Sequence, residues 1–406
     1  MILPRLLGYV LIGTAVVLVA TVVYRNSGKG DTPLIFSPVQ MLEATWLTYT
    51  NTYVEVGTYR TIDTGRGDVT TSEGQSYTML RAVWLNDKTT FDGAWKWTQT
   101  NIYHTSDHLF AWLWGAKPDG TYGVLTNQQG ETSASDADTD IALSLIFAYT
   151  RWQDPAYLAA AHSIVQDIWN KEVVFIQGKP YLAADNLEQS STTYAAINPS
   201  YFNPAAYRIF ARVDPSHPWS TLADDSYTLL AESIQSPLDT SQSAGLPPDW
   251  VQINKYTGAL QAIPSSTNTT HFGFDALRVP FRLALDWEWF HDPRDVSIAK
   301  SLAFLSAQWD ANHQLATTYA HDGTILTTAE VPAMYGGTIG YFMLAAPNTA
   351  SRVYTLKLAY LYNADANTWK TPLSYYDDNW AWFGIALYNH LLPNLATDLP
   401  DSAFKQ

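Results

Sequence analysis

Apolar positions along this chain recur with a helical period over most of its length. From about Ser37 onward they return every three or four residues, which is the pattern of amphipathic helices that bury one face. Strand-like alternation is rare, and its best examples, 173–176 and 315–319, are short. The pattern predicts helices over about 38–55, 74–86, 91–103, 138–152, 155–169, 203–212, 218–235, 275–290, 295–311, 331–346, 350–362 and 379–392. We therefore expect an all-α domain of six helical hairpins.

Several predicted helices begin with a recognisable start signal. A side chain able to cap the helix is followed by proline, which is favoured at the first helical position because it has no N–H to satisfy. This pair occurs at Ser37-Pro38, Asp154-Pro155, Asn203-Pro204 and Asp292-Pro293. No internal repeat is visible, and no Pro- or Ser-rich linker divides the chain after residue 34. We expect a single folded domain over residues 37–398.

The N-terminal region has a different pattern. Residues 6–24 form an uncharged and mostly apolar run of 19 residues, close to the ~20 that cross a bilayer core. Arg5 precedes the run and Arg25 follows it, so the flanking charges do not decide an orientation. Bulky residues stand where a signal peptidase needs small ones, which favours an uncleaved transmembrane signal-anchor over a cleaved signal peptide. Residues 1–5 would be a short tail and residues 25–36 a linker.

Composition and charge narrow the classes of partner. The formal net charge of −15 and the isoelectric point of about 4.8 argue against nucleic acid and against a polybasic membrane surface. Aromatic residues make up 14% of the chain, with 16 Trp and 25 Tyr. Most of these would pack in the core, but Trp and Tyr also stack on the apolar faces of sugar rings. The absence of cysteine excludes disulfides, thiolate nucleophiles and Cys-ligated metals, and leaves the redox compartment open.

Three acids at alternate positions stand at the start of one predicted helix. Asp136, Asp138 and Asp140 lead directly into an apolar stripe, and carboxylates are favoured at a helix start by unpaired backbone N–H groups and the helix dipole. The same spacing matches the first three ligand positions of an EF-hand calcium loop. That loop also requires glycine at position 6 and an acid at position 12, where this chain has Ile141 and Phe147. We therefore expect no calcium site here.

Six short motifs occur in an order that resembles glycoside hydrolase family 8. They are Ser72-Glu73-Gly74-Gln75-Ser76-Tyr77, Ala111-Trp112-Leu113-Trp114-Gly115, Ala134-Ser135-Asp136-Ala137-Asp138, Asn198-Pro199-Ser200-Tyr201, Pro248-Asp249-Trp250 and the pair Asp275/Arg278. The family consists of inverting glycanases that act mainly on β-1,4-linked polysaccharides. The resemblance covers about residues 40–390. Within the family, the chain most resembles the secreted cellulases linked to bacterial cellulose production. It implies an (α/α)6 toroid, the six-hairpin glycosidase fold, here preceded by an N-terminal transmembrane helix.

Inverting hydrolysis needs a protonated acid and an ionised base, roughly 6.5–9.5 Å apart. The resemblance implies Glu73 as the general acid and Asp275 as the general base. From the residues alone, Glu73 could equally complete a helix cap, and Asp275 could form an ordinary surface ion pair with Arg278. A functional Glu73 needs burial or a nearby carboxylate, of which Asp136 is the first candidate, to raise its pKa. Phe274 stands where relatives usually have tyrosine, a departure that could alter water positioning or substrate preference.

The resemblance also implies residues that bind the substrate. Asp136 is counted with the catalytic residues and is expected to hold the sugar at the cleavage subsite, while Asp138 is expected to be orienting or structural. The other expected site residues are Tyr201 beside the catalytic water, Arg278 on the base, and Trp112, Trp114 and Trp250 as stacking platforms. Burial in the core is the alternative for each of these aromatics. The nine His residues show no metal-binding spacing, and no nucleophile elbow or phosphate loop occurs, so we expect no metal and no cofactor.

These observations favour a membrane-anchored inverting endo-β-1,4-glucanase, a cellulase-like hydrolase, with its catalytic domain outside the cytoplasm. Its partners would be a β-linked polysaccharide, the membrane through residues 6–24 and polysaccharide synthesis or export machinery, without nucleic acid. One alternative is the same chemistry on xylan, mixed-linkage β-glucan or chitosan. Another is a non-catalytic glycan-binding scaffold of an export system. Secretion after signal cleavage is the alternative localisation.

Overall fold

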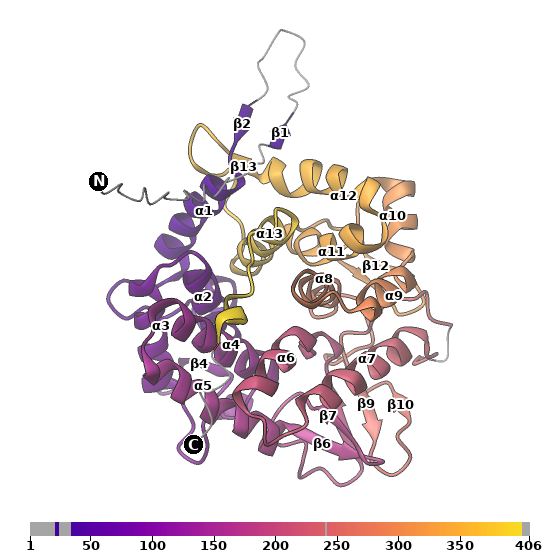
Figure 1. Cartoon of the computed structure of the whole chain (residues 1–406). Coiled ribbons are helices and arrows are strands. Elements are labelled where there is room, and N and C mark those ends of the chain that lie inside the picture. Colours follow the sequence, from indigo (N-terminus) through magenta and orange to yellow (C-terminus); the bar gives the residue numbers. More distant parts are fainter. Residues whose placement is uncertain (1–20, 24–33, 240–241, 400–406) are drawn as a thin grey trace, which may run out of the picture.

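The computed structural model describes residues 21–23, 34–239 and 242–399. The described chain is mostly helical, and its helices alternate between an inner and an outer set (Figure 1). The inner helices are α2 (Ser72–Trp84), α4 (Ser135–Trp152), α6 (Pro204–Val213), α8 (Arg278–Phe290), α11 (Pro332–Ala345) and α13 (Tyr375–Tyr388). The outer helices are α1 (Pro38–Tyr53), α3 (Lys88–Asn101), α5 (Pro155–Asp167), α7 (Trp219–Gln235), α9 (Pro293–Ser301) and α12 (Pro347–Val353), with α10 (Phe304–Asn312) as an extra helix after α9.

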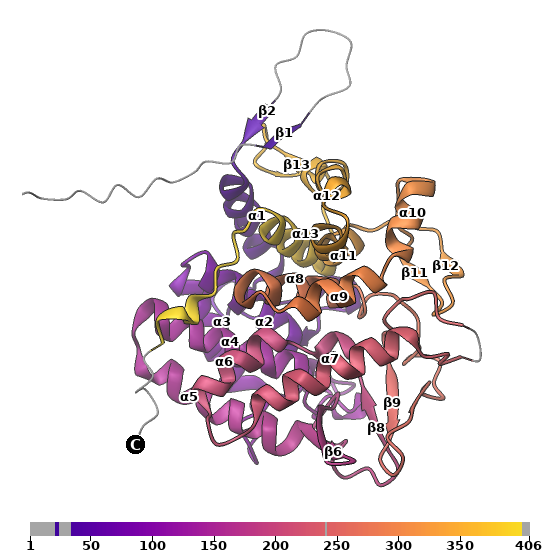
Figure 2. The same ribbon diagram turned by 45° about the vertical axis from the view of Figure 1, so that its right-hand side comes forward.

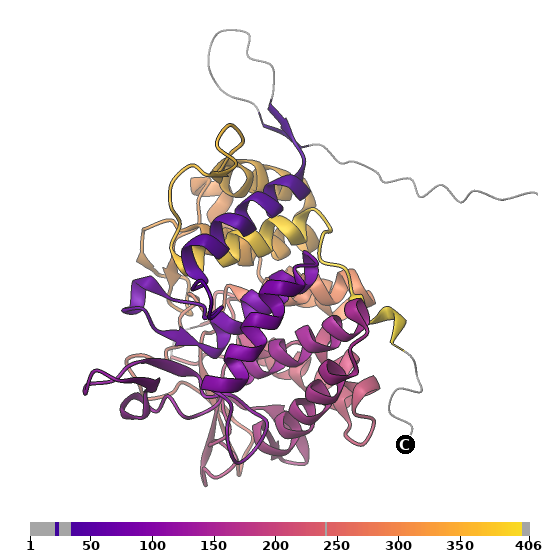
Figure 3. The same cartoon turned by 90° about the vertical axis from the view of Figure 1, so that its left-hand side faces the viewer.

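The inner helices form a closed ring because each packs on the next. Contacts run from α2 to α4, α6, α8, α11 and α13 in order. The ring closes where Tyr77 of α2 packs edge-on against Trp380 and Phe383 of α13. Each outer helix covers an inner neighbour, and Figure 3 shows α1 beside α13 as one such pair. This arrangement agrees with the six hairpins expected from the sequence.

Close packing of the inner helices depends on glycine. A Cβ atom on Gly336 of α11 would lie 1.9 Å from the carbonyl oxygen of Trp380 in α13, far inside van der Waals contact. Gly384 of α13 approaches the backbone of Gly336 in the same way. Because neither residue has a side chain, the two helices meet backbone to backbone and hold the C-terminal side of the ring together.

The predicted helices are confirmed with local corrections. The start signals act as expected at Asp154, Asn203 and Asp292, whose side chains accept from backbone N–H groups, whereas Ser37 precedes its helix without a side-chain cap bond. The prediction of one helix over 295–311 is wrong. The chain bends at Leu302, where a tight turn ends α9 and allows the buried Leu302 and Leu305 both to face the core.

Two predicted boundaries also need correction. The segment 350–362 is α-helical only to Val353 and continues as a π-helical stretch over Tyr354–Leu358 and a 3-10 turn over Ala359–Leu361. Apolar period alone does not distinguish these hydrogen-bond patterns, since buried residues recur in all of them. The helix predicted from residue 275 begins at Arg278, so Asp275 lies in the turn before it.

Short antiparallel strands lie between the helices. One three-stranded sheet contains β3 (Thr70–Thr71), β4 (Leu113–Ala116) and β5 (Tyr122–Val124), and another contains β8 (Tyr194–Ile197), β9 (Val251–Asn254) and β10 (Leu260–Gln261). The other strands form two-stranded sheets: β1/β2 (Thr21–Val23, Leu34–Phe36), β6/β7 (Val173–Ile176, Lys179–Leu182), β11/β12 (Thr318–Tyr319, Ile325–Thr327) and β13/β14 (Tyr362–Asn363, Thr368–Trp369). In Figure 2, β6, β8 and β9 lie at the bottom of the view, beyond the helices. Strand β3 matters most for function because it leads directly into α2.

One strand prediction is confirmed, and the other strand is shorter than predicted. Residues 173–176 form β6 as expected. Of the predicted strand 315–319 only Thr318–Tyr319 pairs, because the backbone N–H groups of Leu315 and Ala316 donate to the hydroxyl groups of Tyr335 and Tyr319. These two N–H groups are therefore bonded to side chains and are not available for pairing in a longer strand.

The described residues include no helix that is long and apolar enough to cross a membrane. The predicted tail 1–5 lies outside the described residues, as do most of the predicted span 6–24 and of the linker 25–36. Their described parts, Thr21–Val23 and Leu34–Phe36, form the antiparallel pair β1/β2.

Candidate active site

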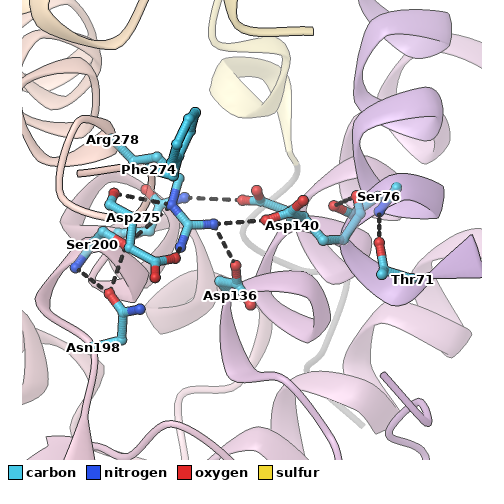
Figure 4. A network of polar contacts seen from close by, with 12 residues as sticks. Thr71, Ser76, Asp136, Asp140, Asn198, Ser200, Phe274, Asp275 and Arg278 are labelled. Atoms are coloured by element: carbon cyan, nitrogen blue, oxygen red, sulfur yellow. Dashed lines mark hydrogen bonds and ion pairs between the residues drawn. The ribbon is translucent and has the colours of Figure 1, made fainter. Parts of the chain in front are cut away.

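Arg278, the first residue of α8, is the centre of a buried polar network (Figure 4). Its side chain is 1% exposed. Nη1 donates to Oε2 of Glu73 at 2.9 Å and to Oδ2 of Asp136 at 2.8 Å, while Nη2 donates to Oδ1 of Asp275. Nε donates to Oγ of Ser200 at 3.1 Å. One cation therefore gathers three acids that are far apart in the sequence, and the hypothesis of an ordinary surface ion pair is wrong.

The acids reach Arg278 because the N-terminal ends of inner helices converge. Glu73 lies in the first turn of α2, Asp136 in the first turn of α4, and Asp275 in the turn before α8. Tyr375 and Tyr376 begin α13 beside them. Unpaired backbone N–H groups and aligned dipoles make each helix N-terminus favourable for negative charge. Their convergence explains how the fold tolerates this concentration of carboxyl groups.

Glu73 has the protonation behaviour that a general acid needs. Helix α2 is capped by Thr71, whose Oγ1 accepts from the N–H of Gly74 at 3.0 Å, and this cap places Glu73 at the ring centre. Although 25% of the side chain remains exposed, desolvation raises its pKa to about 7; Arg278 opposes this shift, and the charges of Asp136 and Asp275 add to it. Burial, more than Asp136, is thus the main cause. Glu73 carries its proton below about pH 7.

Both carboxyl oxygens of Asp275 accept hydrogen bonds from neighbouring side chains. Arg278 donates to Oδ1, and Nε1 of Trp250 donates to Oδ2 at 3.0 Å. Since an ionised carboxylate only accepts hydrogen bonds, donors on both oxygens suit the charged form. The side chain is 31% exposed, so water can reach it.

The turn that carries Asp275 is fixed by Asp249, which was not singled out from the sequence. Oδ1 of Asp249 accepts from the N–H groups of Gly273 and Asp275, both at 3.1 Å, and of Ala276 at 2.7 Å. Burial raises the pKa of Asp249 to about 8, and the charge of Asp275 adds to the effect. Asp249 lies in the Pro-Asp-Trp motif, so its position in the sequence was a usable signal.

Glu73 and Asp275 line the same pocket, which has a volume of about 250 Å³. Its other lining residues are Asp63, Arg66, Thr71, Phe274, Tyr375 and Tyr376. The ring of Phe274 is 48% exposed and packs edge-on against Tyr376 at 5.7 Å, while the Tyr376 hydroxyl donates to the Phe274 carbonyl oxygen. The departure from tyrosine therefore places an apolar ring on the pocket wall.

The predicted aromatic residues lie at different distances from this pocket. Tyr201 packs under Arg278, with the guanidinium carbon 5.1 Å from its ring centre, and meets Trp250 edge-on at 5.8 Å. Trp112 lies beside Arg66, whose guanidinium carbon is 5.9 Å from the indole ring. These three aromatics therefore contact residues of the pocket or of the Arg278 network.

Trp114 is placed differently. Its ring lies 4.7 Å from the guanidinium carbon of Arg60 and packs against Trp97 at 5.2 Å and Tyr122 at 5.4 Å. It is not among the residues that line the pocket of Glu73. The structure brings Tyr201 and Trp250 together with the acids, whereas Trp114 lies in strand β4, next to β3.

The three alternating acids point to different partners. Asp136 binds Arg278, Asp138 accepts from the N–H of Phe110 at 3.1 Å, and Asp140 forms a two-oxygen ion pair with Arg282. They do not share a common cation site, and no group of three or more metal-binding side chains occurs in the described part of the chain.

Comparisons with known proteins show the family to which the chain belongs. Residues 34–377 match Glycosyl hydrolases family 8, and the chain belongs to this family. An endoglucanase of Salmonella typhi is 36% identical over 225 residues, which are 54% of this chain and 56% of the relative. An endoglucanase of Cellulomonas uda is 30% identical over 249 residues, 61% and 64% of the two chains. The chain therefore spans less than two thirds of the length of these curated relatives.

A solved structure matches over more of the fold. The endo-1,4-D-glucanase of Vibrio fischeri ES114 superposes with a TM-score of 0.70 at 25% identity, over 85% of this chain and 94% of that protein. The family resemblance inferred from the sequence motifs is thus confirmed, and the ring of helices fits the (α/α)6 toroid that it implied.

Proposed function

We propose that this protein is an inverting endo-β-1,4-glucanase in which Glu73 is the general acid and Asp275 the general base. The observation that carries the proposal is that both carboxyl groups line one pocket. Glu73 holds a proton up to about pH 7, while Asp275 has hydrogen-bond donors on both oxygens and access to water. The endoglucanase activity of the relatives supports a β-1,4-glucan as substrate.

In the proposed reaction Glu73 donates its proton to the glycosidic oxygen as the bond to the anomeric carbon breaks. Asp275 accepts a proton from a water molecule that attacks the same carbon from the opposite face, which inverts its configuration. Arg278 stabilises the carboxylate that forms on Glu73. Proton exchange with solvent then restores both groups.

The remaining predicted residues have roles around this centre. Asp136 accepts from Arg278 and would bind the sugar at the cleavage subsite, where a distorted ring is needed. Tyr201 packs between Arg278 and Trp250 and would border the attacking water. Trp112 and Trp250 would stack on sugars near the pocket, and Trp114 would do so farther along the cleft wall.

We further propose that residues 6–24 anchor the protein in a membrane with the catalytic domain on the outer side. The apolar run and the extracellular location of polysaccharide polymers support this placement. Polysaccharide synthesis or export machinery is the proposed partner.

The test uses the full-length chain in detergent, with Glu73→Gln as control. Viscosity and reducing ends are followed on soluble cellulose, mixed-linkage β-glucan, xylan and chitosan. Rapid viscosity loss on soluble cellulose, with the α-anomer appearing first in the proton NMR spectrum, is the expected result. Activity on only one of the other polymers would make that polymer the substrate in place of β-1,4-glucan. Binding without hydrolysis would favour the glycan-binding scaffold.

A further inference from the structure

A second carboxyl pair lies behind the acids of the pocket. Asp138, in the first turn of α4, and Glu172, directly before β6, are both 0% exposed. The two side chains are in hydrogen-bond contact with each other. Glu172 was not singled out from the sequence, because a single acid after a lysine carries no recognisable pattern there.

In each acid, one carboxyl oxygen accepts a hydrogen bond from a neighbouring residue, and the other oxygen has no donor apart from the paired acid. Oδ1 of Asp138 accepts from the N–H of Phe110 at 3.1 Å, and Oε1 of Glu172 accepts from Oγ of Ser133 at 2.5 Å. Oδ2 of Asp138 and Oε2 of Glu172 are buried and receive no donor from the rest of the described chain. Two carboxylate oxygens form a hydrogen bond only when one of them carries a proton.

The surroundings favour a shared proton over two charges. The ionisable groups that act on the pair include Asp136, Asp185 and Tyr207, and none of these three can carry a positive charge. Desolvation raises the pKa of both carboxyl groups, and it raises that of Asp138 well above its usual range. Two buried anions in contact would repel each other without solvent to stabilise either charge, so one neutral partner is the stable state.

The backbone of Glu172 is linked by hydrogen bonds to the residue before Asp136. The backbone N–H of Ala183 donates to the carbonyl oxygen of Glu172 at 2.8 Å, and Oγ of Ser135 donates to the carbonyl oxygen of Ala183 at 2.6 Å. Ser135 is the residue before Asp136. Movement of Glu172 would therefore reach Asp136 through short, buried contacts.

We propose that Asp138 and Glu172 hold a single proton between them and act as positioning residues for Asp136. With one partner neutral, the pair adds only one negative charge behind Asp136 and leaves it free to bind Arg278 and the sugar as an anion. The positioning role rests on the proposed function, whereas the shared proton does not.

The proton is counted in the native, full-length protein by infrared spectroscopy at about pH 7. Replacing both acids, Asp138→Asn with Glu172→Gln, should lower the protonated-carboxyl band by the intensity of one group. An unchanged band would mean that the pair holds no proton, and a loss of two groups would mean that both acids are neutral. Either result overturns the proposal. Glu131→Gln, which removes an exposed acid, is the matched control.

The positioning role is tested by kinetics on the preferred glucan. Glu172→Gln keeps the acceptor for Ser133 and supplies an N–H for Asp138, so it should retain most of the wild-type kcat. Glu172→Leu should lower kcat at least tenfold with little change in KM, because Asp136 acts mainly on the distorted sugar. If the wild type and both variants have the same kcat, the positioning role is overturned. The role is also overturned if both variants lose kcat equally while their thermal midpoints stay unchanged. A wild type inactive on every glucan would overturn the proposed function and leave the proton count valid.

Discussion

The guanidinium of Arg278 lies 2.9 Å from the carboxyl group of Glu73, although 205 residues separate them in the chain. A cation this close favours the ionised acid, yet the pKa of Glu73 is raised to about 7 because desolvation outweighs it. The same guanidinium binds Asp136 and Asp275. Burial therefore leaves the proton on Glu73, although the guanidinium binds all three carboxyl groups.

Replacing Arg278 should damage both activity and stability. In Arg278→Lys a single ammonium group cannot reach all three acids, and misplacement on this scale costs about 10²-fold in kcat. In Arg278→Leu the buried acids lose their cation, with an expected loss of about 3–5 kcal/mol in the free energy of unfolding. Steady-state kinetics and urea denaturation measure these effects. Wild-type kcat in Arg278→Lys would contradict the central role of this residue.

The pH profile should follow the proton on Glu73. The free enzyme is competent while this acid is protonated, so kcat/KM should fall as pH rises through about 7. Glu73→Gln should lower kcat by about 10²–10⁴-fold and remove this alkaline limb. Glu131→Gln changes an exposed acid outside the pocket and should keep the wild-type profile. An alkaline limb that persists in Glu73→Gln would assign the proton to another group.

Asp249 should prove necessary for the position of the general base. Asp249→Ala removes the acceptor for three backbone N–H groups, and kcat should fall at least tenfold, by roughly 1.4 kcal/mol or more of transition-state stabilisation. Asp249→Asn keeps an acceptor oxygen and should lose less. Kinetics of the two variants give the comparison, and equal activity of Asp249→Ala and the wild type would show that the turn holds without this side chain.

Stability should decline between about pH 5 and 8. The native pKa values of Glu73, Asp249 and Asp295 are raised to about 7, 8 and 8, above the values near 4 of unfolded chains. The native state then binds more protons than the unfolded state, and it loses this advantage as pH rises through the raised values. His321 acts in the opposite sense because burial lowers its pKa, but one group does not offset three.

The thermal midpoint measured across this range tests the sign of the effect. Asp295 offers a variant far from the pocket, since its Oδ1 accepts from the Tyr227 hydroxyl at 2.8 Å in a cluster with Asp286. Asp295→Asn should make the decline less steep. A midpoint that rises from about pH 5 to 8 would contradict the linkage.

Gly336 should not accept a side chain. The Cβ atom of Gly336→Ala would meet the carbonyl oxygen of Trp380 at 1.9 Å, so α11 and α13 must separate, at a cost of about 1–3 kcal/mol or more. Gly65→Ala is the control, because its Cβ atom would have ordinary contacts at an exposed position. Thermal denaturation of both variants checks the difference, and equal midpoints would mean that the two helices can separate freely.

Much of the helical structure could be predicted from local signals. The period of apolar residues, the cap-proline pairs and the acids at helix starts act within about four residues, so they can be recognised without knowledge of the fold. The break at Leu302 and the π-helical stretch after Val353 were missed because buried residues keep nearly the same spacing through them. The family motifs drew attention to Glu73, Asp136 and Asp275 before any geometry was known.

The chemistry of these acids depends on contacts between distant segments. Closure of the inner ring, which requires backbone contact at Gly336, brings the helix N-termini together around Arg278. Burial in that centre, and not any local motif, raises the pKa of Glu73, and the pairing of Asp138 with Glu172 has no counterpart in sequence spacing. Helix identity follows from short-range periodicity, whereas protonation states and the partners of each carboxyl group follow from which helix ends meet in the folded ring.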